Sequence, residues 1–191
     1  MPRNIEFPLP IKLDKLTRIV RIRGVDVCLH WTLIVIWAVI LLNAIHAPLL
    51  SLVGLCCYTA VLLIHECGHL IAAQKLNCQV YSIELYPNFG ICRFEVPWSR
   101  FEHCVIAWGG VIAQAIVAIP FVIWLAIFGY SSFQPSNAAM VLLGIFSLFV
   151  AAFNLLPIGH LDGAVAWGLL PALFRRSRMQ AQESTRYKSP R

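Results

Sequence analysis

Charged side chains are scarce in this sequence. Asp, Glu, Lys and Arg together make up 13% of its 191 residues, whereas a soluble domain has about 25%. Hydrophobic residues make up 59%. This balance excludes an ordinary soluble domain and indicates a polytopic membrane protein with one compact domain.

Two long stretches lack charge except at one position each. Between Val27 and Gln74 the exception is Glu66, and between Cys104 and Phe174 it is Asp162. A lone charge in a transmembrane helix costs roughly 2.5–3.5 kcal/mol or more, so intramembrane ionisable residues mark functional sites by default. Both carboxylates are therefore candidate site residues.

Cysteine pairs of the CxxC type and internal repeats are also absent. The seven cysteines are an odd number, and most lie in or beside apolar segments, so neither a disulfide framework nor a thiolate zinc site is expected. Transporters usually show repeats or paired broken helices. The absence of repeats disfavours a membrane metal transporter or metal-binding protein, which is kept as the alternative function. A di-iron oxygenase is also disfavoured, because it needs several histidine clusters.

Four segments are long and apolar enough to cross a bilayer, which takes about 17–25 residues. They are 29–49, 52–73, 104–129 and 138–157. A shorter apolar piece, 163–174, is expected to continue the fourth helix or to lie at the interface. The polar, basic residues before Leu29 predict no cleavable signal peptide.

The distribution of basic residues predicts the topology. Lys and Arg cluster before the first span and after the last, whereas the loops 46–51 and 130–137 carry no charge. The positive-inside rule then places both termini in the cytoplasm, with the cell inner (plasma) membrane as the expected location. A nucleic-acid partner is disfavoured because the basic ends lack interleaved aromatics and any binding module.

The main polar interruption predicts a small β-hairpin over 80–96 on the cytoplasmic side. Residues 80–86 and 91–96 alternate and are rich in β-branched side chains, and they flank a Pro87–Gly90 turn. Residues 19–25 also alternate, like a short strand before the first span. The predicted class is all-α polytopic, with about four transmembrane helices and this hairpin.

A metal site is predicted by the sequence HECGH at 65–69. Residues i and i+4 share one face of a helix, so His65 and His69 can bind one ion while Glu66 takes a proton from water. The opposite reading is two histidines satisfied by neighbouring helices. Topology brings Asp162 to the same membrane face, which makes it the preferred third ligand, and His160 competes with it.

These residues resemble the site-2 protease family of intramembrane zinc metalloproteases. The resemblance is carried by HECGH and by the later N-x-x-P-x-x-x-x-D-G of Asn154, Pro157, Asp162 and Gly163, and it covers roughly 20–174. It implies one Zn²⁺ held by His65, His69 and Asp162, Glu66 as catalytic acid/base, and a catalytic core of the last three spans.

Two uncharged polar residues keep alternative interpretations. Asn154 either donates a hydrogen bond to the developing oxyanion or caps the backbone that Pro157 breaks. Gln114 stands where relatives often have asparagine, and it either contacts a substrate carbonyl or joins helices. The hairpin likewise either accepts a substrate strand or simply covers the site.

The predicted function is intramembrane zinc endopeptidase acting on transmembrane protein substrates. The domain plan is a basic segment 1–28, a transmembrane peptidase domain 29–174 and a basic tail 175–191. No PDZ or CBS domain is recognisable, so regulation is expected from separate proteins or from the tails. An inactive relative acting as a scaffold is a further alternative.

Overall fold

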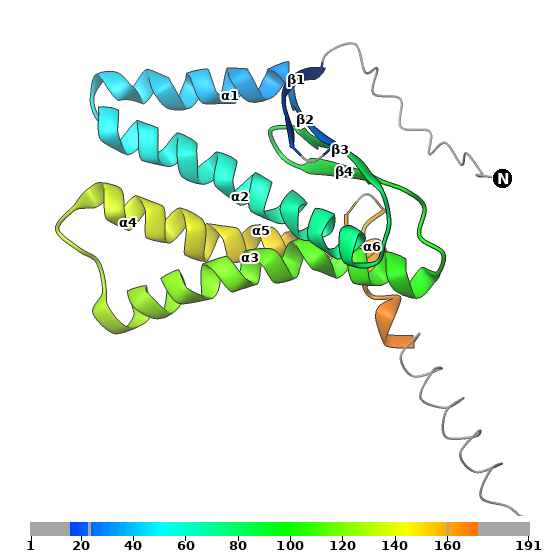
Figure 1. Ribbon diagram of the computed structural model, residues 1–191. Coiled ribbons are helices and arrows are strands. Elements are labelled where there is room, and N and C mark those ends of the chain that lie inside the picture. Colours follow the sequence, from blue (N-terminus) through cyan, green and yellow to red (C-terminus); the bar gives the residue numbers. More distant parts are fainter. Residues whose placement is uncertain (1–15, 23, 160, 172–191) are drawn as a thin grey trace, which may run out of the picture.

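The computed structural model describes residues 16–22, 24–159 and 161–171 and is mostly helical, with one small sheet (Figure 1). The predicted tail 175–191, residues 1–15 of the N-terminal segment and His160 lie outside the described residues.

Within the described residues, three helical segments are long and apolar enough to cross a membrane. They are α2 (Pro48–Lys75), α3 (Arg100–Phe128) and a composite segment made of α4 (Gln134–Met140), the π-helical stretch η3 (Val141–Phe146) and α5 (Ser147–Asn154). Figure 1 shows α2 and α4–α5 running in the same direction, with α3 antiparallel to both. The chain is an integral membrane protein built around these helices.

The first predicted span is shorter than expected. Helix α1 (Trp31–Leu42) continues only into the 3₁₀ turn η2 (Asn43–Ile45). The residues before it belong to a strand that ends at His30, and Pro48 begins the next helix. Exposed apolar side chains such as Ile34, Val39 and Leu42 make α1 a lipid-facing helix by composition. Its crossing of the bilayer stays a prediction.

The predicted hairpin forms, but it is half of a larger sheet, which corrects the all-α class. The strands are β1 (Leu16–Ile22), β2 (Val25–His30), β3 (Val80–Leu85) and β4 (Gly90–Phe94), in the order β1-β2-β3-β4. Strands β2 and β3 are parallel, and the other two pairs are antiparallel. An isolated two-stranded hairpin is only marginally stable, so the added strands give it support.

A hydrophobic core joins the sheet to the C-terminal half of α2. Its buried members come from the strands and from helices α1, α2 and α3, and they include Leu29, Leu33, Leu62, Ile83 and Ile106. This packing fixes the β3–β4 turn beside the part of α2 that carries HECGH.

The sheet contains a buried carboxylate that is paired with a cation of the same sheet. Glu84 is 3% exposed and forms an ion pair with Arg93, whose Nη2 donates to Glu84 Oε2 at 3.1 Å. The Tyr86 hydroxyl donates to the same oxygen at 3.4 Å. The hydrogen bond to Glu84 raises the pKa of Arg93. This buried charge is therefore compensated within the sheet.

Candidate metal centre

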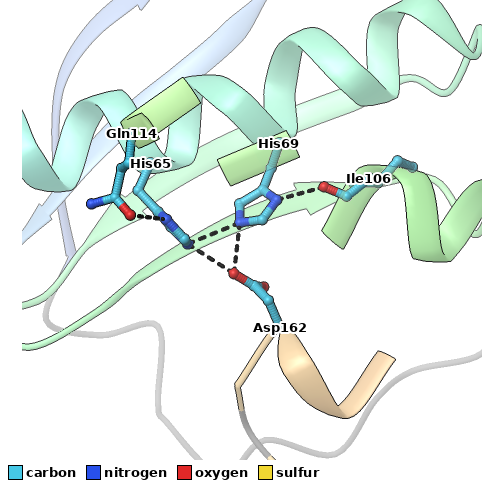
Figure 2. A network of polar contacts seen from close by, with 5 residues as sticks. All are labelled: His65, His69, Ile106, Gln114 and Asp162. Carbon is cyan, nitrogen blue, oxygen red and sulfur yellow. Dashed lines mark hydrogen bonds and ion pairs between the residues drawn. The ribbon is translucent and has the colours of Figure 1, made fainter. Parts of the chain in front are cut away.

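Helix α2 presents two histidines one turn apart. His65 and His69 are 7% and 6% exposed, and their Nε2 atoms lie 3.1 Å apart with the rings nearly perpendicular, at 85°. Because both side chains leave the same face of the helix, they aim at one point between α2, α3 and the chain after α5 (Figure 2).

Asp162 reaches the same point from the turn that follows α5. Its Oδ2 lies 2.9 Å from His65 Nε2 and 3.2 Å from His69 Nε2. The parallel course of α2 and α5 explains why residues 97 positions apart meet.

The outer nitrogens of both rings have partners of their own. His65 Nδ1 lies 3.0 Å from Gln114 Oε1, and His69 Nδ1 lies 2.8 Å from the Ile106 carbonyl oxygen. Both partners accept hydrogen bonds, so each Nδ1 donates, and in the neutral rings that a metal ion requires each Nε2 keeps its lone pair facing inward. Three acceptor atoms thus converge without an intervening donor.

This donor set fits a small divalent cation. Two imidazoles and a carboxylate are common zinc ligands at bond lengths near 2.0–2.2 Å, and tetrahedral geometry then separates the ligand atoms by about 3.3 Å. The observed separations are 2.9, 3.1 and 3.2 Å. A single proton relieves only part of the repulsion among three acceptors, whereas a metal ion relieves all of it.

Glu66 and Asn154 lie at the cavity beside this cluster. The cavity has a volume of about 720 Å³ and is lined by both histidines, Asp162, Glu66, Asn154 and the β3–β4 turn. Glu66 is 2% exposed, and a Cβ atom added at Gly90 would overlap its carboxylate. Glycine at the start of β4 is what allows the strand to approach this side chain.

Side chains of α3 hold the segment that carries Asp162. The Trp108 indole donates to the Ala166 carbonyl at 3.0 Å, and the Cys104 thiol donates to the Val165 carbonyl at 3.1 Å. Both carbonyls lie in or directly beside the short helix α6 (Gly163–Ala166). A Cβ at Gly163 would overlap the Leu155 carbonyl, which explains the glycine after Asp162.

Sequence reasoning missed the glycines that bring the helices together. A Cβ at Gly110 would lie 2.6 Å from His69 Nε2, and Gly68 and Gly109 approach each other's backbone between α2 and α3. The signal was present as a Gly-Gly pair in one span and a glycine inside HECGH, because small residues let membrane helices pack closely.

The fold and the site together define a helical integral membrane protein with a candidate metal centre near one end of its long helices. Comparison with solved structures finds similarity to the Site-2 Protease from Methanocaldococcus jannaschii. The TM-score is 0.65 and the sequence identity 23%, over 84% of this chain and 72% of that one. The resemblance to the site-2 protease family is confirmed in the fold. Neither a protein-family model nor a curated protein matches the sequence.

Proposed function

We propose that this protein is an intramembrane zinc endopeptidase that hydrolyses peptide bonds in or near transmembrane segments of other membrane proteins. The observation that carries the proposal is the convergence of His65, His69 and Asp162 beside the carboxylate of Glu66 at one cavity. Ligation alone does not require Glu66, so its presence favours hydrolysis over metal storage.

The residues divide the work of amide hydrolysis. His65, His69 and Asp162 would hold one Zn²⁺, which when bound supplies a Lewis acid that polarises a carbonyl and activates water. Glu66 takes a proton from the attacking water and passes it to the leaving amine. Asn154, at the end of α5 and lining the cavity, donates a hydrogen bond to the developing oxyanion.

The substrate must present an extended backbone to this cavity. Strand β4 is an edge of the sheet and contributes Gly90, Ile91 and Cys92 to the cavity wall. A transmembrane substrate that unwinds locally can add to this edge as a further strand, which uses main-chain hydrogen bonds and so demands little of the sequence.

The topology is part of the proposal. We place four crossings in the cell inner membrane, with both basic termini in the cytoplasm and regulation by separate proteins. A C-terminal epitope should become accessible to antibody in spheroplasts only after permeabilisation. Labelling of intact spheroplasts would reverse the assigned orientation.

Glu66→Gln tests the mechanism on a co-expressed panel of single-span substrates. Loss of a general acid/base costs about 10²–10⁴-fold in rate, so cleavage should fall by that factor while zinc stays bound. Glu84→Gln, at a buried carboxylate of the sheet, is the matched control and should cleave at the wild-type rate. Persistent cleavage by a zinc-loaded Glu66→Gln protein contradicts the mechanism, and a zinc-loaded wild type that cleaves nothing favours a metal-binding protein or an inactive relative.

A further inference from the structure

Gln114 lies in the middle of α3 and is 0% exposed. Its Oε1 accepts the hydrogen bond from His65 Nδ1 at 3.0 Å. Figure 2 shows Gln114 and Asp162 on opposite sides of the His65 ring. The amide therefore touches the nitrogen that faces away from the acceptor cluster.

The surroundings of Gln114 bear on its two predicted roles, which are contact with a substrate carbonyl and the joining of helices. It is not among the residues that line the cavity, so a direct contact with a substrate carbonyl lacks a path. Its Oε1 joins α3 to α2 only through the ring of His65, and its Nε2 has no hydrogen-bond partner among the described residues. The hydrogen bond to His65 is therefore the contact from which we argue the role of Gln114.

That bond decides which nitrogen of His65 carries the proton. A neutral imidazole has one N–H, and an acceptor at Nδ1 places it there, leaving the Nε2 lone pair directed at Asp162 and His69. The Ile106 carbonyl does the same for His69. A backbone carbonyl stays in place under any substitution, whereas the His65 partner is a side chain and can be removed.

We infer that Gln114 is a positioning residue that fixes the tautomer and ring orientation of His65 and so sets the metal affinity of the site. This inference rests on the proposed zinc-dependent function. Loss of such outer partners typically costs 10–100-fold in metal affinity.

The test compares Gln114→Met, which keeps the length but offers only a weak thioether acceptor, with Gln114→Glu, which keeps an oxygen at the same reach. Chelator competition should show about 10–100-fold weaker Zn²⁺ binding for Gln114→Met, and affinity near that of wild type for Gln114→Glu. Ser147→Ala is the matched control, since Ser147 is equally buried and its hydroxyl is also unpaired among the described residues. It should leave zinc affinity unchanged.

A second readout needs neither activity nor metal. Nitrogen NMR of ¹⁵N-histidine in the zinc-free protein should show His65 as the Nδ1–H tautomer in wild type and a mixture in Gln114→Met. Wild-type affinity in Gln114→Met, or an Nε2–H tautomer in the wild type, overturns the inference. Should Glu66→Gln still cleave while Gln114→Met binds zinc weakly, the protease mechanism fails and the positioning role stands.

Discussion

Glu84 in the sheet and Asp162 beside the helices are both carboxylates held largely away from solvent, with side chains 4% and 24% exposed. Glu84 faces a guanidinium and a hydroxyl that donate to it. Asp162 faces the Nε2 atoms of His65 and His69, and each ring donates its hydrogen bond from Nδ1, on the far side of the ring. The charge of Glu84 is compensated by residues of the chain, whereas Asp162 belongs to a cluster that needs a cation from outside.

The difference separates a structural charge from a functional one. A buried ion pair with its own hydrogen bonds contributes to one stable arrangement of the sheet. Converging buried acceptors without donors cost folding free energy, and binding of a cation offsets that cost. Removing a charge from each region should therefore change different measured quantities.

The largest effect is expected from Asp162→Asn. Loss of a ligand should weaken zinc binding by more than about 100-fold, beyond the usual cost of losing an outer partner. The unfolding free energy of the zinc-free protein should change by less than about 1 kcal/mol, because the new amide can donate to a histidine Nε2. Chelator competition and thermal denaturation in detergent with EDTA measure the two quantities. Unchanged zinc affinity would remove Asp162 from the ligand set.

Arg93→Met should give the opposite pattern. Glu84 loses its cation, so the unfolding free energy should fall by roughly 2–3 kcal/mol, below the 3–5 kcal/mol of a fully buried pair because Arg93 is 41% exposed. Zinc affinity should not change. Arg18→Met, at an exposed arginine whose partner Asp26 also pairs with Arg21, is the control and should cost less than about 1 kcal/mol. A large fall in zinc affinity with Arg93→Met would show that the ion pair of the sheet also determines the metal affinity of the cluster.

How far the sequence could predict these regions depends on the distance over which each signal acts. The i, i+4 spacing of His65 and His69 and the alternation in 80–96 are local, so the helical pair and the hairpin could be expected. The parallel pairing of β2 with β3 joins Asp26 to Ser82, and no local pattern reports such a contact. Strand β2 also takes the first two residues of the expected span 29–49, and the start of α2 at Pro48 ends that span early.

The site divides in the same way. Asp162 could be placed near the histidines because span direction is set by topology, a coarse property. The partners of each ring could not, since Gln114 and the Ile106 carbonyl reach them only through the rotation and spacing of α3. That spacing depends on glycines such as Gly109 and Gly110, whose effect appears only once the facing helix is known.

Gly90→Ala tests where the sheet and the site meet, and its effect should be the smallest of the three. The new Cβ would overlap the Glu66 carboxylate, so either β4 or Glu66 must shift. A displacement of about 1 Å at a catalytic group costs on the order of 100-fold in rate, and partial relaxation of the strand should keep the loss of cleavage at about 10–100-fold. Zinc affinity should hold, because all three proposed ligands lie outside β4.

Gly54→Ala is the control for Gly90→Ala, since nothing lies within 4 Å of the added Cβ on that turn of α2. It should cleave at the wild-type rate. If Gly90→Ala loses cleavage and keeps zinc, the strand acts on the proton-transfer residue and not on the metal ligands. If it cleaves at the wild-type rate, Glu66 has room to move without cost, and its position against β4 has no part in catalysis. The sheet would then be a cover for the site, with its Glu84–Arg93 pair serving stability alone.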